Sequence, residues 1–244
     1  MLILAIESSA KPVSVAVYSV SDESDALASD NLSAGRPAGK LLGQYFQNNG
    51  FSHSRTLLAL AETLLKNLDL KPADIGLIAV ASGPGSFTGV RIGVSAAKGL
   101  AWGLDIPVCG VSTLEAMAYQ TPEPGVIICP VMDARREQVY NALFEWREGM
   151  PVRLRDDRAI SLEDLADDLR GFSTPCLLVG DGVAVCKGFE AFSDCRVAPE
   201  LLRYQTAYGV ALAAMNTESI PAVYLEPWYL RPSQAERERG GGNN

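Results

Sequence analysis

The order of the predicted strands and helices repeats along the chain. An apolar run at Met1–Ile6 ends at Glu7 and is followed by a hairpin, further strands, a helix and a buried strand. The same order begins again near Val126, where Asp133 ends the first strand as Glu7 does in the first half. Internal repetition of this kind is typical of duplicated structural units. The sequence therefore predicts two α/β lobes with a cleft between them; two unrelated α/β halves are the alternative.

The spacing of apolar residues predicts the individual elements. Val13–Tyr18 alternates valine with other residues, which predicts a half-buried strand, whereas Gly35–Asn49 shows no clear element. Helices are predicted over Ser54–Leu68, Thr88–Gly103, Thr113–Tyr119, Ser161–Leu169 (with Ser161 and Asp164 as its cap) and Thr206–Met215. Other strands are predicted near Leu27–Leu32 and over Ile75–Ala81, Ile106–Val111, Val126–Asp133, Glu137–Trp146, Val152–Arg158 and Cys176–Gly180.

These elements divide the chain into two lobes and a tail. The N-terminal lobe is predicted at residues 1–110, and a smaller, degenerate C-terminal lobe at residues 111–232. Residues 233–244 are charged and then rich in glycine, so they have little apolar surface to bury. Because such segments cannot offset the entropy lost on ordering, we expect this tail to be disordered.

Charge and cysteine content limit the partners and the compartment. The net charge is −8, from 21 basic and 29 acidic side chains, and no basic run is present. Binding of nucleic acid relies on cations that displace counterions from phosphates, so we do not expect this chain to hold tRNA alone. No apolar run is long enough to span a membrane, the N-terminus lacks the basic start of a signal peptide, and the five cysteines show no CxxC spacing. We therefore expect reduced thiols, a cytoplasmic location and no membrane contact.

The most specific segment is a glycine loop that joins a predicted buried strand to a predicted helix. Its residues of interest are Ser82, Gly83, Gly85, Ser86, Phe87, Thr88 and Arg91. Glycine permits backbone angles that other residues resist, Pro84 fixes one φ angle, and Ser86 and Thr88 can cap the helix. The loop can be interpreted as an anion site at a helix N-terminus or as a tight strand-to-helix turn. No Walker or GxGxxG motif supports the first interpretation.

Two neighbouring predicted helices carry a candidate interface. Small residues four positions apart form one stripe on the second helix, and apolar residues form a broad face on the first; the candidates are Gly89, Gly93, Ala97, Ala101, Leu57, Leu58, Ala61 and Leu65. Small side chains allow another backbone to approach closely. We predict that this surface contacts a partner or a second copy of the chain, with close packing on the lobe's own sheet as the alternative.

The sequence offers few residues for catalysis. Its one histidine, His53, precedes an apolar helix, and neither a two-histidine metal motif nor a Ser-His-Asp triad is supported. Glu7 and Asp133 each end a strand at a hairpin, where acids can bind a metal–phosphate unit. Glu7, Ser8 and Ser9 form only a weak phosphate hairpin, and a turn or solvent-facing role is the favoured interpretation of both acids.

Four segments of the chain resemble the TsaB (formerly YeaZ) family. They are Ile3–Ser9, Ser82–Gly93, Val131–Arg136 and Tyr224–Arg231, and the match spans most of residues 1–232. The resemblance implies a duplicated acetate kinase/Hsp70/actin-like (ASKHA) fold. It also implies a role in forming N6-threonylcarbamoyladenosine at position 37 of tRNAs that read ANN codons.

The same resemblance implies partners and a lack of independent chemistry. The family is similar to TsaD, the catalytic subunit, whose metal-binding HxxxH motif corresponds here to Thr113 and Met117. These side chains cannot replace two imidazoles at a metal. We therefore expect a non-catalytic subunit without metal or cofactor. It would pair with TsaD, or with itself, through the two helices, allow the ATPase TsaE to join, and meet tRNA only through the complex. A stand-alone ATPase or small-molecule kinase of the same fold is the alternative.

Overall fold

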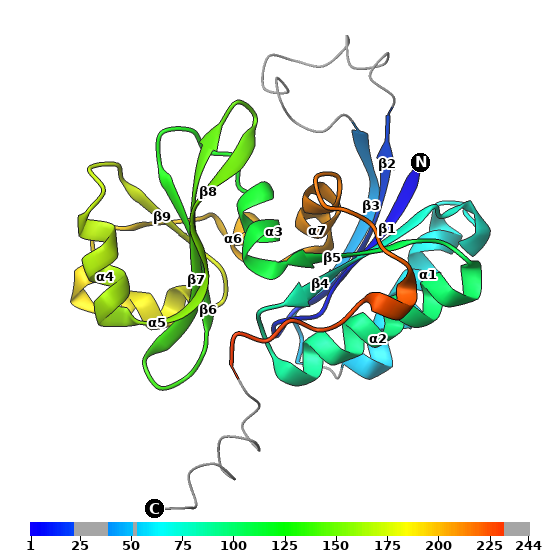
Figure 1. The fold of residues 1–244 in the computed structure, drawn as a ribbon, viewed down its shortest axis with the longest axis horizontal. Coiled ribbons are helices and arrows are strands. Elements are labelled where there is room, and N and C mark those ends of the chain that lie inside the picture. The colour runs from blue at the N-terminus through cyan, green and yellow to red at the C-terminus, as the bar shows by residue number, and fades with distance from the viewer. Residues whose placement is uncertain (22–38, 51–52, 232–244) are drawn as a thin grey trace, which may run out of the picture.

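The computed structural model describes residues 1–21, 39–50 and 53–231 of the chain. Figure 1 shows two sheets, one in each half of the molecule, with helices outside and between them. The strand predicted near Leu27–Leu32 and the tail predicted at residues 233–244 lie outside the described residues. Within the described ranges, no helix combines the length and the apolar character that crossing a bilayer requires.

The first sheet has five strands in the order β3-β2-β1-β4-β5. Its elements are β1 (Leu2–Glu7), β2 (Val13–Val20), β3 (Gly39–Gln47), α1 (His53–Asn67), the short helix η2 (Pro72–Asp74), β4 (Leu77–Gly83), α2 (Phe87–Leu104) and β5 (Val108–Ser112). Strands β1, β2 and β3 are antiparallel neighbours, while β4 runs parallel to β1 and β5 runs parallel to β4. Helices α1 and α2 cover the outer face of this sheet (Figure 1).

The second sheet repeats the same arrangement. Its order, β8-β7-β6-β9-β10, matches that of the first sheet strand for strand, with the same antiparallel and parallel neighbours. Its elements are β6 (Ile127–Asp133), β7 (Gln138–Arg147), β8 (Met150–Ser161), α4 (Leu162–Arg170), β9 (Cys176–Val179), α5 (Val183–Lys187), η3 (Glu190–Phe192) and β10 (Arg196–Val197). The predicted duplication of an α/β unit is therefore confirmed.

The helix that ends each repeat packs against the sheet of the other repeat. The chain continues from β5 into α3 (Thr113–Tyr119), and from β10 through α6 (Glu200–Arg203) into α7 (Ala207–Ala214) and η4 (Ala222–Tyr224). Leu114 and Met117 of α3 belong to the core of the second sheet, whereas Val210 and Ala211 of α7 belong to the core of the first. This exchange joins the two lobes, and Figure 1 shows α3 and α7 side by side at the centre of the molecule.

Two strand predictions differ from the structure. Val13–Tyr18 was predicted to be half-buried, but β2 is buried on both faces because α1 packs on one side and α7 on the other. The region Gly35–Asn49, in which no clear element was predicted, contains β3. A side chain at Gly43 of β3 would lie only 3.0 Å from Leu64 of α1, so glycine there allows the helix to pack closely on the strand.

The boundary expected between residues 110 and 111 falls inside β5. In addition, α7 and η4 come from the second half of the sequence but pack on the first sheet. The division into residues 1–110 and 111–232 therefore stays a prediction about sequence ranges, while the two repeated sheets are the units that the structure describes.

Candidate functional site

The glycine loop lies between two other backbone segments. Ser86 N donates a hydrogen bond of 2.6 Å to Ser9 O in the first hairpin. An added Cβ at Gly85 would come within 2.4 Å of Ser9 O, and one at Gly83 within 2.1 Å of Trp228 O. Glycine is needed at both positions because the flanking segments leave no space for a side chain. The tight-turn interpretation of the loop therefore agrees with its packing.

Helix α2 begins directly after this loop. Ser86 is its N-cap and accepts a hydrogen bond of 3.3 Å from Gly89 N, as the sequence predicted for Ser86. Thr88, the other predicted cap, lies within the first turn and is exposed. Ser86, Phe87 and Thr88, at this end of the 18-residue helix, line the cleft described below.

A C-terminal segment, which we name the strap (residues 225–231), crosses the glycine loop. Trp228 N donates a 2.7 Å hydrogen bond to Ser82 O. The Tyr229 ring stacks on Phe87 with centroids 4.7 Å apart, and the Arg91 guanidinium lies 3.9 Å from the Phe87 centroid. Arg91 Nε also donates to the Tyr229 hydroxyl at 2.9 Å. Phe87 and Arg91 therefore hold the strap, a role that their sequence positions alone did not indicate.

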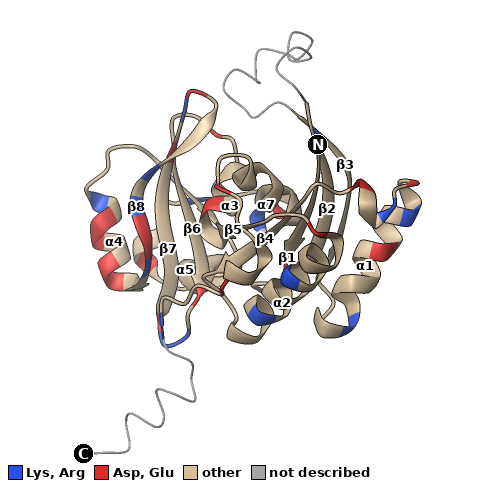
Figure 2. Cartoon of the chain, turned by 45° about the vertical axis from the view of Figure 1, so that its right-hand side comes forward, with Lys and Arg blue, Asp and Glu red and all other residues tan. Residues whose placement is uncertain are grey.

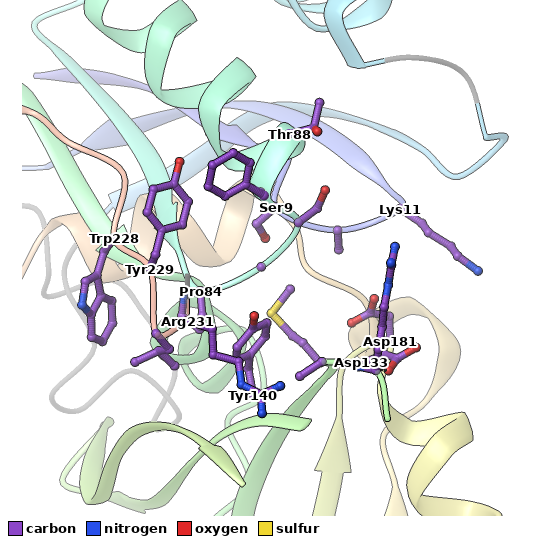
Figure 3. Close-up of a pocket in the computed structure, with 18 of the residues that line it drawn as sticks. Ser9, Lys11, Pro84, Thr88, Asp133, Tyr140, Asp181, Trp228, Tyr229 and Arg231 are labelled. Atoms are coloured by element: carbon purple, nitrogen blue, oxygen red, sulfur yellow. Dashed lines mark hydrogen bonds between the residues drawn. The ribbon is translucent and has the colours of Figure 1, made fainter. Parts of the chain in front are cut away.

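A cleft of about 720 Å³ lies between the lobes (Figure 3). Of the predicted residues, it brings together Ser9, Gly85, Ser86, Phe87 and Thr88 with Asp133. It is also lined by residues that the sequence analysis did not select, among them Lys11, Tyr140, Asp181, Trp228, Tyr229 and Arg231. The guanidinium of Arg231 hydrogen-bonds to Gln138 of β7, so the strap reaches the second lobe. Glu7, Ser8, Ser82, Gly83 and Arg91 do not line the cleft.

Asp181 is the acidic residue of the cleft that the sequence analysis did not select. Burial raises its pKa, opposed by the 2.9 Å hydrogen bond that Gln205 Nε2 donates to Asp181 Oδ1, and the nearby Asp133 carboxylate raises it further. Asp181 and Asp133 lie close together on the second-lobe side in Figure 3. The duplication offered a signal, because Gly180-Asp181-Gly182 follows β9 where the glycine loop follows β4.

Of the turn or solvent-facing role that the sequence analysis favoured for Glu7, the solvent-facing part is wrong, whereas its hydrogen bonds lie in the turn after β1. Its side chain is fully buried, and Oε1 accepts hydrogen bonds of 2.6 Å from both Ser9 N and Ser9 Oγ. The other oxygen, Oε2, has no hydrogen-bond partner. Burial raises the pKa of Glu7 to about 7, with a smaller contribution from Asp181, although the Ser9 hydrogen bonds oppose the rise. Asp133, at the matching position, is exposed as expected.

We expect Glu7 to make folding stability pH-dependent. The folded pKa of about 7 lies above the value of 4.5 for the free side chain, so the folded state holds the proton more tightly. The contribution is complete below pH 4.5 and is lost as pH rises through 7, by about 3 kcal/mol. Glu7→Gln resembles the protonated form and is expected to remove this loss, as measured by urea unfolding at mildly acidic and alkaline pH.

Asp133→Asn is the matched control for this measurement, because it changes the equivalent but exposed acid. It should leave the part of the pH dependence that comes from Glu7 intact. If Glu7→Gln retained the same slope of stability against pH as wild type, the assignment of this slope to Glu7 would be wrong.

The structure also places the residues that the sequence analysis considered for metal binding or catalysis. Among the residues described, no three histidine, cysteine, aspartate or glutamate side chains are grouped to hold a metal ion. Thr113 and Met117, which correspond to the two histidines of TsaD in the sequence resemblance, are fully buried. His53 is the first residue of α1, where its Nε2 lies 3.0 Å from Lys11 O, in agreement with a polar helix-entry role.

The candidate interface residues lie mostly on the inner side of their helices. Gly89, Gly93, Ala97 and Ala101 are buried, as are Leu57, Ala61 and Leu65, whereas Leu58 is 53% exposed. A Cβ at Gly89 would meet Ser8 O at 2.1 Å, and one at Gly93 would meet Ser8 Oγ at 2.4 Å. The small stripe therefore packs against the protein's own first hairpin and sheet, which was the alternative interpretation.

An apolar groove lies between the outer sides of the same two helices. It is lined by His53, Ser54, Leu57, Leu58, Phe87, Thr88, Arg91, Ile92, Ser95 and Ala96. Arg91 is the only lysine, arginine or acidic residue in this set. Figure 2 shows α1 and α2 next to each other with few charged positions on α2. The groove is thus the exposed surface that the two helices share.

Comparisons with known proteins were consistent with one another. A family model described as "TsaD: tRNA N6-adenosine threonylcarbamoyltransferase" matches residues 49–189, more than half of the chain. The Bacillus subtilis "tRNA threonylcarbamoyladenosine biosynthesis protein TsaB" is 37% identical over 147 residues, covering 60% of this chain and 64% of that protein. The Haemophilus influenzae protein of the same name is 29% identical over 199 residues, covering 74% and 80%.

A solved structure shares the whole fold. It is a Pseudomonas aeruginosa protein described as having similarity to peptidase YEAZ, with a TM-score of 0.75 and 24% identity over 94% of this chain and 99% of that chain. At this identity the likeness concerns the fold, and it agrees with the duplicated actin-like α/β architecture. With the sequence relatives and the family model, it leads to one conclusion: the chain belongs to the TsaD family in the broad sense of that model and, within it, to the TsaB (YeaZ) family.

Proposed function

We propose that this protein acts in the biosynthesis of threonylcarbamoyladenosine on tRNA as a non-catalytic partner of TsaD. In this role it binds and stabilises TsaD, which forms N6-threonylcarbamoyladenosine at position 37 of tRNAs reading ANN codons, and allows TsaE to join. The name of the relatives supports the pathway. The α1–α2 groove is the observation that carries the partner role.

The groove supports binding to another protein for two reasons. First, Leu58, Ile92 and Ala96 present apolar atoms at the surface of two adjacent helices, where a partner helix could bury them. Second, the buried residues of the same helices fix their separation, because Leu57 and Val90 belong to one core cluster. The surface is therefore rigid before a partner arrives, which lowers the entropic cost of association. The same surface suits a homodimer when TsaD is absent.

Two features support the lack of independent catalysis. Glu7, the acid of the first hairpin, is buried and bonded to Ser9 and does not line the cleft. Thr113 and Met117 are fully buried and offer no imidazole for a metal. The acidic net charge of −8 also supports contact with tRNA through the complex and not by this chain alone. Because the proposed complex with TsaD acts on tRNA, we also place the protein in the cytoplasm.

Omitting this chain tests the proposal. A mixture of TsaD, TsaE, substrate tRNA, ATP and the threonylcarbamoyl donor should form the modified nucleoside only when this protein is added, as measured by mass spectrometry of digested tRNA. Equal modification without it would refute the partner role. Steady ATP turnover by the purified chain alone would instead favour the stand-alone ATPase or kinase.

A further inference from the structure

Four of the five cysteines lie together in the core of the second lobe. Cys129 is on β6, Cys176 begins β9, Cys186 is on α5, and Cys195 directly precedes β10. Neither the cleft nor the α1–α2 groove includes any of them. All five cysteines are free thiols in the structure. The cluster therefore needs an explanation separate from the proposed partner role.

The strand register brings two of these thiols opposite one another. Parallel strands β9 and β10 pair Leu177 with Arg196, so the residues immediately before them, Cys176 and Cys195, are neighbours across the sheet. Neighbouring strands lie about 4.8 Å apart, which falls within the range of about 4.4–6.8 Å between the Cα atoms of a disulfide. Each thiol affects the pKa of the other, in agreement with this proximity. The strand register therefore places this pair of cysteines within reach of a disulfide.

Cys176 has a second thiol neighbour, Cys129. Strand β6 pairs Ile127 with Cys176, and Cys129 lies two residues further along on the same face. Cys129 is fully buried and accepts a hydrogen bond of 3.3 Å from Asn141 Nδ2, whereas Cys195 is only partly buried. An oxidant in solution can therefore reach Cys195 before the other members of the cluster.

We propose that Cys176 and Cys195 form a peroxide-responsive dithiol site, in which Cys195 is oxidised first and Cys176 closes the disulfide. In the first step the Cys195 sulfur attacks one oxygen of hydrogen peroxide. The O–O bond breaks, and Cys195 becomes a sulfenic acid with release of water. In the second step the Cys176 sulfur attacks the sulfenic sulfur, and the hydroxyl leaves as a second water. Two thiols are oxidised, and one peroxide is reduced to two waters.

The surroundings set the rate of this reaction. The contact with Cys176 and burial raise the pKa of Cys195, while the nearby Lys187 ammonium opposes this rise. Lys187 Nζ also donates a 2.8 Å hydrogen bond to Cys195 O, which fixes the segment before β10. Because the thiolate is the attacking species, the reaction should be slow at neutral pH and faster in mildly alkaline buffer.

The bond would enclose a functional segment. Residues 176–195 contain Asp181 of the cleft together with α5 and η3. A disulfide across their ends constrains the unfolded chain and ties β10, the edge strand, to β9. Oxidation is thus expected to raise the thermal midpoint of the protein, and reduction with dithiothreitol should reverse the change.

Peptide mapping of the intact protein tests the site. After treatment with hydrogen peroxide and alkylation of free thiols, digestion without reduction should give one linked pair of peptides, Cys176 with Cys195, lighter by two hydrogens. Cys195→Ser should abolish this pair. Cys109→Ser, which changes a buried thiol on β5 of the first lobe, is the matched control and should leave it intact.

Three results would overturn the proposal. One is a linkage of Cys129 to Cys176 in place of the Cys195 pair; Cys129→Ser would then lose the cross-link. Another is Cys195 carrying two or three added oxygens with no cross-link. The third is that the cysteines of the folded protein stay unmodified under peroxide conditions that oxidise the urea-unfolded chain. None of these results depends on TsaD, so the dithiol site and the proposed partner role can fail independently.

Discussion

Replacing Gly89 by alanine is expected to destabilise this protein by about 3 kcal/mol, although alanine is the better helix former. The added Cβ would lie 2.1 Å from Ser8 O, which is backbone and cannot turn aside. Ser8 is fully buried, and its Oγ donates a 2.9 Å hydrogen bond to Gly89 O. Relief of the clash therefore requires the first hairpin and α2 to separate. The free energy of unfolding, measured with urea, is the readout.

The same helix supplies a matched control. Gly99 is exposed on α2, and a Cβ there meets no atom within 4 Å. Gly99→Ala should therefore be neutral or stabilise the protein by up to about 1 kcal/mol, the usual gain in a helix interior. If Gly89→Ala were as stable as Gly99→Ala, the close contact between α2 and the first hairpin would not exist in solution.

This pair of glycines illustrates what the sequence could predict about α2. The four-residue spacing of Gly89, Gly93, Ala97 and Ala101 correctly indicated a close backbone approach. It could not indicate whether that backbone belonged to the same chain or to a partner, because small residues suit both. The backbone that approaches is Ser8, which follows β1 and lies 81 residues before Gly89 in the same chain, so the contact is internal packing.

Other parts of the fold could be predicted because they depend on local sequence patterns. The repeated order of strands and helices depends on local periodicity, so most strands of both sheets were predicted, although β3 and β10 were not. The Ser161 cap of α4 was also predicted, and its Oγ accepts from Asp164 N at 3.0 Å. The full burial of β2 depends on α7, which comes nearly 200 residues later in the chain. Such burial follows from tertiary contacts that a local pattern does not contain.

At the candidate site, too, contacts between distant parts of the chain could not be predicted from local patterns. Phe87 and Arg91 were selected as loop residues, but their contacts with Tyr229 depend on the strap, which follows at the end of the described chain. Likewise, the raised pKa of Glu7 results from burial and from Asp181 in the other lobe. The sequence could therefore indicate which residues to consider. The surroundings of these residues depend on contacts between distant parts of the chain, which a local pattern does not contain.

The outer groove leads to the second large effect. Leu58→Asp is expected to weaken binding to TsaD at least about tenfold, a change of about 1.4 kcal/mol, because a partner would bury a carboxylate in a groove lined with apolar side chains. Leu58 is 53% exposed in the isolated chain, so the variant should fold as wild type does. Isothermal titration with TsaD measures the affinity, and size-exclusion chromatography of the chain alone measures homodimer formation.

Leu201→Asp provides the control for this substitution. Leu201 is 91% exposed on α6, outside the groove, so the same change of side chain adds the same charge without touching α1 or α2. It should bind TsaD as wild type does. Equal weakening by both variants would assign the effect to net charge, and no weakening by Leu58→Asp would place the TsaD contact elsewhere. Loss of TsaD binding with Leu58→Asp alone, in a chain of unchanged stability, identifies the outer faces of α1 and α2 as the partner surface.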